Sequence, residues 1–173
     1  MERSIYSDTA VSAGMEITSR HHLRSDDVRR LREAIADRFG VEFEGEQFEA
    51  IEFADRPFRL VLVDGIPMVL DGENGPMLTV RGANAVEPRR AVVTVDAGAV
   101  PFVSDGADVM RPGIVDADDG IATGDPVLIA EETHGKVLAI GRAQTAGPDM
   151  VGDHGKVIES IHHVGDELYN VST

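Results

Sequence analysis

The chain has 173 residues, of which 31 are acidic and 16 are basic, giving a formal net charge of −15. At about 100–200 residues per domain, this length allows one domain or two small ones. Apolar residues make up 42% of the chain, enough for a packed core, which excludes a disordered acidic tail. So high a negative charge disfavours charge-driven binding to nucleic acid or to anionic membranes.

The chain contains no cysteine, which excludes disulfides, thiolate metal sites and a cysteine nucleophile. Its first ten residues, MERSIYSDTA, lack the basic start and apolar run of a signal peptide. No stretch approaches the roughly 18 uninterrupted apolar residues of a transmembrane helix. We therefore expect a cytoplasmic protein that does not enter the membrane.

The cations are almost all arginines, since Lys136 and Lys156 are the only lysines. A composition with many carboxylates and very few lysines is typical of proteins from a cytoplasm that holds molar salt. There the Debye length falls to about 3 Å, so that repulsion between surface carboxylates is screened. The alternative is an acidic mesophilic protein from a GC-rich genome. Halophily is the favoured interpretation, because GC bias raises arginine over lysine without producing the charge of −15.

In chain order, residues 1–19 show no sustained periodicity and predict a flexible arm. Ser25, Asp26 and Asp27 then supply N-cap chemistry and first-turn acids. From Val28 to Phe39 apolar residues recur at helical spacing, and a glycine follows as a stop signal. The pattern predicts an amphipathic helix of about three turns.

Short apolar runs separated by turn-forming residues follow this helix, and they predict strands. The runs cover residues 48–53, 58–63, 66–70 and 77–81. Together with the helix they predict an N-terminal α+β domain over residues 20–88, in which the helix lies on a mainly antiparallel sheet.

A proline-marked polar segment at residues 87–90 is the predicted boundary between two domains. Beyond it, the sequence predicts one or two helical turns within residues 97–104 and several short strands punctuated by glycine. The strands are expected at residues 91–95, 127–130, 137–140, 157–164 and 168–171. This pattern predicts a compact β-barrel over residues 91–172.

Motifs of an enzyme are absent: the chain has no Gly-x-Ser-x-Gly, no P-loop and no Gly-x-Gly-x-x-Gly behind a strand. His162 and His163 are neighbours in a predicted strand, so they point to opposite faces and cannot ligate one metal from regular geometry. Paired acids such as Asp118–Asp119 are interpreted as solvated surface. We therefore expect no catalytic residue, no metal and no cofactor.

The segment from Asp105 to Ile114 combines a glycine that permits close backbone approach with a stiffening proline. Such a loop could present Arg111 and backbone N–H groups to a ligand, or it could simply connect two strands. Lys136 and Arg142 flank a predicted strand nearby in the sequence. Arginine clusters before residue 90 fit either phosphate contacts or surface ion pairs, and ion pairs are favoured.

Ordered blocks of the C-terminal half together resemble a PUA domain, a small RNA-binding pseudo-barrel of RNA-modifying enzymes and translation factors. The matching blocks, over about residues 92–171, are residues 95–103, 106–114, 124–127, 135–143, 155–159 and 162–169. The preceding helix-and-sheet half makes the whole chain similar to the stand-alone archaeal PUA proteins, relatives of the MCT (malignant-T-cell-amplified) and ligatin translation proteins. The Arg20-His21-His22-Leu23 segment is also similar to the start of that family.

This resemblance implies an α+β protein in which an N-terminal helix-plus-antiparallel-sheet domain precedes a PUA-type pseudo-barrel. It implies a non-catalytic protein that binds structured RNA, either tRNA or small-subunit rRNA, in translation initiation or ribosome function. We further expect a monomer. Backbone groups of the glycine-rich loop would approach the RNA, Arg111 and Arg142 would make charge-assisted contacts, and Lys136 would add a charge. The expected RNA-binding residues are Gly106, Ala107, Asp108, Met110, Arg111, Pro112, Gly113, Lys136, Gly141 and Arg142.

Two other functions fit the same sequence. The chain could be an accessory subunit of a tRNA- or rRNA-modifying enzyme, or an acidic protein-interaction module of the translation machinery. The half beyond residue 90 carries 14 acids against four cations. An RNA interface there would therefore rely on local geometry more than on charge, and its affinity would depend only weakly on salt.

Overall fold

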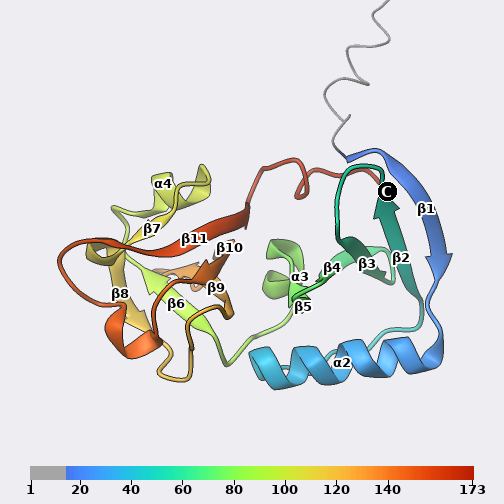
Figure 1. Ribbon diagram of the computed structural model, residues 1–173, viewed down its shortest axis with the longest axis horizontal. Coiled ribbons are helices and arrows are strands. Elements are labelled where there is room, and N and C mark those ends of the chain that lie inside the picture. Colours follow the sequence, from blue (N-terminus) through green and yellow to red (C-terminus); the bar gives the residue numbers. More distant parts are fainter. Residues whose placement is uncertain (1–14) are drawn as a thin grey trace, which may run out of the picture.

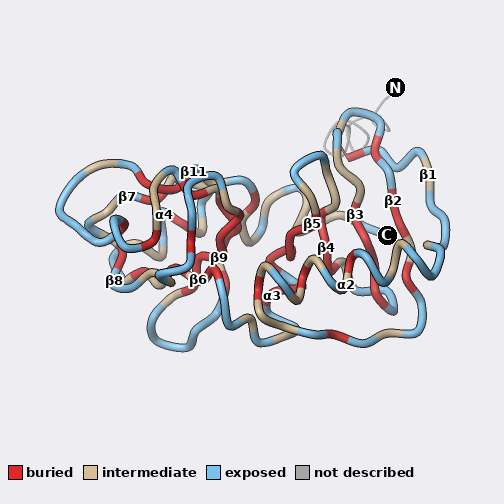
Figure 2. The backbone as a smooth tube through the Cα atoms, turned by 60° about the horizontal axis from the view of Figure 1, so that its bottom comes forward, coloured by how far each residue is buried: buried red, intermediate tan, exposed pale blue. Residues whose placement is uncertain are grey.

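The computed structural model describes residues 15–173, whose strands form two sheets in two units that lie side by side (Figure 1). The protein is mixed α/β and consists mostly of sheet, which confirms the expected antiparallel N-terminal sheet and C-terminal barrel. Buried residues follow the strands of both units (Figure 2). No helix in the described range is long and apolar enough to cross a membrane.

The N-terminal unit, residues 15–86, is a meander in which each strand pairs with the next one along the chain. Its sheet order is β1-β2-β3-β4-β5, all antiparallel. Short turns join β2 to β3, β3 to β4 and β4 to β5 without a crossover, whereas the longer segment of residues 23–47, which contains a helix, joins β1 to β2. The strands are β1 (Ile17–His22), β2 (Phe48–Phe53), β3 (Arg59–Val63), β4 (Ile66–Gly72) and β5 (Gly75–Leu78).

Helix α2 (Ser25–Phe39) is the amphipathic helix that the sequence predicts. It buries Leu31 and Ile35, and it ends at Gly40, whose left-handed φ of 65° suits glycine. The predicted N-cap is wrong by one residue. Ser25 is the first helical residue, and Arg24 occupies the cap position without a side-chain hydrogen bond.

Helix α3 (Val80–Ala85) replaces the end of the strand expected at residues 77–81. Strand β5 stops at Leu78, and Thr79 then caps the new helix by accepting a hydrogen bond from the Gly82 amide at 2.8 Å. Apolar residues run on through this boundary, so periodicity alone did not reveal it. The cap is a Thr side chain at the position where such caps are favoured.

The expected flexible arm, residues 1–19, lies mostly outside the described residues. Of its described part, Ile17 to Ser19 begin strand β1, which pairs with β2 along the edge of the sheet. The pairing is antiparallel and continues to His22, opposite Glu49. These residues are therefore part of the N-terminal sheet.

The C-terminal unit, residues 91–163, is a six-stranded sheet of order β7-β11-β10-β9-β6-β8. Strands β7 and β8 stand at opposite edges of this order, yet only the three residues of η2 join them. The sheet must therefore curl until its two edges approach each other, which gives a near-barrel. Its strands are β6 (Val92–Val95), β7 (Val109–Met110), β8 (Ile114–Ala117), β9 (Pro126–Glu131), β10 (Val137–Ala143) and β11 (Lys156–His163), with α4 (Val100–Ser104), η2 (Arg111–Gly113) and η3 (Gly147–Asp149) between them.

The barrel strand predicted at residues 168–171 is absent, and residues 168–170 form a turn instead. The partly buried apolar residues Leu168, Tyr169 and Val171 pack against the core, so their pattern reflects burial without strand pairing. Conversely, the segment 105–114, expected as a loop, contains the short strand β7 and the one-turn 3-10 helix η2.

Two backbone-directed contacts join the units where the chain crosses between them. The Asn84 side chain of α3 donates to the Val137 carbonyl at 3.0 Å and accepts from the Val137 amide at 2.8 Å. The carbonyl of Phe39, at the end of α2, accepts from the amides of both Arg89 and Arg90. Hydrogen bonds therefore hold the chain both just before and within the predicted boundary segment, residues 87–90.

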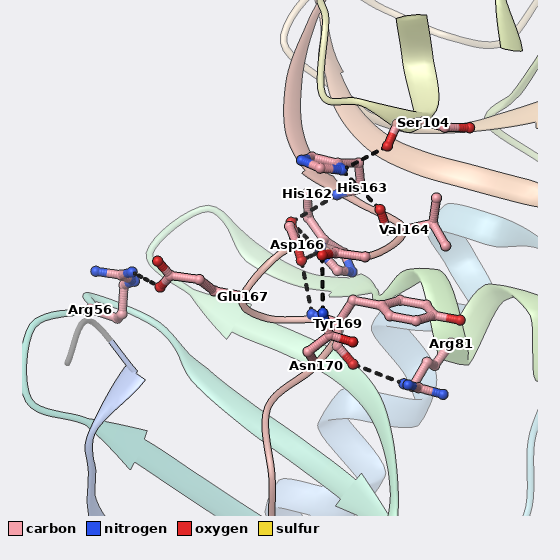
Figure 3. Close-up of polar contacts among 11 residues, drawn as sticks. Arg56, Arg81, Ser104, His162, His163, Val164, Asp166, Glu167, Tyr169 and Asn170 are labelled. Atoms are coloured by element: carbon pink, nitrogen blue, oxygen red, sulfur yellow. Dashed lines mark hydrogen bonds and ion pairs between the residues drawn. The ribbon is translucent and has the colours of Figure 1, made fainter. Parts of the chain in front are cut away.

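After β11, residues 164–173 form a C-terminal strap that runs from the barrel to the N-terminal unit (Figure 1). Asp166 fixes its start (Figure 3). The carboxylate accepts hydrogen bonds from the amides of His163 and Tyr169 at 2.9 and 2.8 Å. It also accepts from Nδ1 of the buried His162 at 2.9–3.0 Å, so that nitrogen carries a proton. His162 and His163 are thus both hydrogen-bonded within the fold.

The strap contacts two arginines of the N-terminal unit (Figure 3). Glu167 forms an ion pair with Arg56 at 3.1 Å. Arg81 of α3 donates to the Tyr169 carbonyl at 3.1 Å and stacks over the Tyr169 ring, 4.0 Å from its centroid. Asp166 sets the turn that brings both strap residues to these partners.

We predict that Asp166→Asn destabilises the protein and reduces its sensitivity to acid. Burial raises the pKa of Asp166. Hydrogen bonds from His162, His163 and Tyr169 together lower this pKa by more than burial raises it, so the pKa lies below its usual range. The resulting stabilisation is present above the unfolded-state pKa of about 3.9 and is lost as pH falls through the folded-state pKa. At neutral pH the variant should lose about 1–3 kcal/mol of unfolding free energy.

Denaturant unfolding at several pH values measures this effect. Asp119→Asn is the control, because Asp119 is exposed and has no hydrogen bond or ion pair with any of residues 15–173. Equal stability of wild type and Asp166→Asn across the acid range would contradict the assigned role of this carboxylate.

Candidate nucleic-acid interface

The glycine-rich segment singled out from the sequence lies at the seam where the two edges of the barrel meet. We use the term loop face for three neighbouring parts: α4, residues 105–113 and residues 149–155. Helix α4 and the second part are joined because the Ala107 amide donates to the Phe102 carbonyl. The third part contacts the second where the Arg111 amide donates to the Gly155 carbonyl at 2.8 Å.

Gly106 is required by both conformation and space. Its φ of +94° is left-handed, and a Cβ there would lie 2.7 Å from Nε2 of His163. The amides of Gly106 and Ala107 donate to the carbonyls of Val103 and Phe102, closing α4. These two amides are thus used within the fold, whereas the family resemblance implies that they approach the RNA.

Asp108 braces the loop against strand β11. Its carboxylate accepts from the Ser160 amide at 2.9 Å and pairs with Lys156 at 3.4 Å. The backbone hydrogen bond from Ser160 lowers the pKa of Asp108 more than desolvation raises it, and Lys156 adds to the lowering. The charge of Lys156 is compensated by this pair.

Arg111 also turns inward, toward residues 149–155. Its Nε donates to the Asp149 carbonyl at 2.9 Å and its Nη1 to the His154 carbonyl at 3.0 Å. Two of the five guanidinium N–H groups are therefore engaged within the protein. Gly113 is packed too, because its carbonyl accepts from the Asp96 amide at 2.9 Å.

Apolar side chains make up the outward surface of this frame. Phe102 is 67% exposed and Met110 is 49% exposed, and Pro112 and Val151 are exposed beside them in the sequence segments of the loop face. Exposed aromatic and apolar groups on a braced frame suit stacking against a flat ligand. Sequence reasoning included Met110 and Pro112 but missed Phe102, whose signal was an aromatic residue in the short helix preceding the glycine-rich segment.

The remaining predicted residues lie elsewhere on the barrel. Gly141 is buried in β10, where a Cβ would overlap Ile158 of β11, so it serves strand packing. Arg142 donates to the Gly124 carbonyl at 2.9 Å and lines a cavity of about 620 Å³ between the two units, whose lining includes no loop-face residue. Lys136 is exposed in the β9–β10 turn and forms no ion pair within residues 15–173. The structure thus groups residues 106–113 and separates these three from them.

The loop face carries more negative than positive charge. Four carboxylates, those of Asp105, Asp108, Asp149 and Asp153, stand against the single guanidinium of Arg111. Such a surface does not attract a polyanion over long distance. Any binding here would depend on contact and shape. Among residues 15–173 there is also no cluster of three or more His, Asp or Glu side chains suited to a metal ion.

Comparison with known proteins places this architecture in a family. The family model described as the PUA domain matches residues 91–164, which is the barrel. An uncharacterized protein of Methanocaldococcus jannaschii is 35% identical over 90% of this chain and 98% of its own length. The translation machinery-associated protein 20 of Saccharomyces cerevisiae is 31% identical over 73% of each chain.

Among solved structures, a conserved PUA domain protein from Thermoplasma acidophilum superposes with a TM-score of 0.76. It is 31% identical, and the match covers 87% of this chain and 97% of that one. Both units are therefore shared with the archaeal protein, which confirms the resemblance noted in the sequence. The chain belongs to the family of stand-alone archaeal PUA-domain proteins that also includes the translation machinery-associated protein 20 of yeast.

Proposed function

We propose that this protein binds structured RNA through its loop face, without catalysis, in a step linked to translation. Membership of the PUA family and the yeast relative associated with the translation machinery support this function. The observation that carries it is the pair of exposed side chains, Phe102 and Met110, held at the barrel seam on a hydrogen-bonded frame. We propose tRNA or small-subunit rRNA as the RNA.

The mode of binding follows from the charge of the loop face. Because carboxylates outnumber cations there, the protein cannot rely on phosphate neutralisation for affinity. Base–aromatic stacking contributes about 1–3 kcal/mol per base and needs no net charge. In RNA, bases free to stack occur in single-stranded loops, bulges and ends. The proposed target is therefore an unpaired nucleotide presented by a folded RNA.

Within this proposal, the residues of the loop have different roles. Gly106, Ala107, Asp108 and Gly113 set the shape of the frame, whereas Met110, Pro112 and Phe102 provide its contact surface. Lys136 and Arg142 are available only to an RNA that extends beyond the loop face. Gly141 acts through the packing of β10 on β11.

The wider setting is proposed from composition. Molar salt in the cytoplasm would screen the charge of −15, both within the protein and between protein and RNA. We propose that the protein works as a monomer, with residues 20–88 and 91–172 as its two domains. The strap would then hold these domains in one fixed arrangement on the RNA.

Phe102→Ala should weaken binding to an unmodified tRNA transcript about tenfold, because it removes one stacking surface. Ile66→Ala is the matched control, since Ile66 is 46% exposed but lies on the N-terminal sheet. Fluorescence anisotropy at constant salt gives both dissociation constants. Equal loss in the two variants would point to a nonspecific apolar effect, and no binding by wild type to tRNA or to small-subunit rRNA would contradict the proposed function.

The affinity for RNA should also fall less steeply with salt than that of a basic RNA-binding domain. Each phosphate neutralised in single-stranded nucleic acid contributes about 0.7 to the slope of log K against log salt. A loop face with one guanidinium predicts a slope of about one or less. A titration from about 0.1 M to about 1 M KCl measures it. A steep slope would instead assign the contact to the arginine clusters of the N-terminal unit.

A further inference from the structure

Arg111 stands at the point where the barrel closes. It is the first residue of η2, the three-residue connection between the edge strands β7 and β8. Strand β7 has only two residues and pairs with β11 alone. A seam with so little strand pairing needs other contacts to stay closed, and Arg111 supplies three hydrogen bonds there.

The partner of Arg111, residues 149–155, is anchored at its start by the buried Met150, but residues 151–155 beyond that anchor have few contacts of their own. No amide of residues 151–155, all of them described, donates a hydrogen bond to another group of the protein. The segment is held instead through its carbonyls: those of Asp149 and His154 accept from the guanidinium, and that of Gly155 accepts from the Arg111 amide. One residue therefore accounts for the attachment of this segment to η2.

Two glycines make space for this side chain. A Cβ at Gly152 would lie 2.8 Å from Cδ of Arg111, and a Cβ at Gly155 would lie 2.9 Å from its Nη1. Gly155 also has a φ of +98°. The backbone of the segment thus wraps closely around the arginine, which leaves the guanidinium little freedom to swing outward to a phosphate.

We infer that Arg111 is a positioning residue: it fastens residues 149–155 to the barrel seam, so that Val151 and Met110 form one surface for the RNA. This inference rests on the proposed function, and it assigns to Arg111 a role other than the phosphate contact expected from the sequence. In this role Arg111 depends on the two N–H groups that its planar guanidinium directs at two carbonyls, more than on its charge. A lysine carries the same charge but cannot reach two carbonyls with a planar fork.

The experiment compares Arg111→Lys with Arg111→Gln in binding to the tRNA transcript across the KCl series. For a positioning residue, both variants should weaken binding by a similar factor, about tenfold, with the wild-type salt slope. A phosphate contact predicts a different result. Lysine would retain most of the affinity, and glutamine would make the slope shallower by about 0.7 to 0.9.

Gly152→Ala tests the same inference without altering any charge. Its new methyl group should displace the Arg111 side chain and reproduce the weaker binding of Arg111→Lys, again at the wild-type salt slope. Arg38→Lys is the matched control for Arg111→Lys. Arg38 likewise donates to two carbonyls, those of Asn74 and Pro76, but it lies in the N-terminal unit. The control should bind the transcript as wild type does.

Hydrogen exchange separates local from global effects and requires no RNA. In Arg111→Lys and Gly152→Ala, the amide of residue 111, which donates to the Gly155 carbonyl in wild type, should exchange faster, while the amides of β9 and β10 should keep their wild-type rates. Unchanged exchange of the residue 111 amide would overturn the inference, as would wild-type RNA affinity in Arg111→Lys. If wild type itself fails to bind RNA, the proposed function fails, and the exchange result still decides whether Arg111 holds the segment.

Discussion

The C-terminal strap that spans the two units depends on the hydrogen bonds of one carboxylate, that of Asp166. It joins the end of β11, through His162 and the His163 amide, to the strap, through the Tyr169 amide. With that turn set, Glu167 and Tyr169 reach Arg56 and Arg81 on the N-terminal unit. In a chain with a charge of −15, the two units gain nothing from long-range attraction. Short, directed hydrogen bonds therefore have to hold them together.

Arginine in this protein acts as a hydrogen-bond donor to the backbone as well as a surface charge. Arg38, Arg81, Arg90, Arg111 and Arg142 each donate to a main-chain carbonyl. Surface ion pairs contribute about 0–1 kcal/mol and are weakened by salt, whereas a guanidinium that donates to a main-chain carbonyl needs no opposite charge as its partner. The abundance of arginine over lysine thus has a structural use in addition to any adaptation to salt.

Local patterns in the sequence were sufficient for most of the fold. The period of α2 and the apolar runs of β2, β3 and β4 are each complete within a few residues, so they could be predicted without knowledge of the rest. Helix α3 was missed because its cap lies inside a continuous apolar run. Residues 168–171 resembled a strand because packing against another unit also buries apolar residues.

The candidate interface was harder to predict than the fold, for a different reason. The glycine-rich loop could be located from its composition, but the role of its arginine could not. The carbonyls that bind Arg111 belong to Asp149 and His154, about 40 residues further along the chain. Only the curling of the sheet brings them together. A guanidinium next to a proline and a glycine therefore looks identical in sequence whether it faces a ligand or the protein.

The two sheets differ in the order in which they can be completed as the chain leaves the ribosome. Every strand of the N-terminal sheet pairs with its immediate neighbour, so this sheet can form as soon as β5 has emerged. The barrel must wait, because β6 lies parallel to β9 and because β7 and β10 both need β11. Until β10 has emerged, Asn84 lacks its hydrogen-bond partner Val137. The side of α3 that β10 will cover then faces solvent. Nascent chains of this protein thus pass through a stage with one finished sheet and an exposed docking surface, which is the stage most open to capture by chaperones.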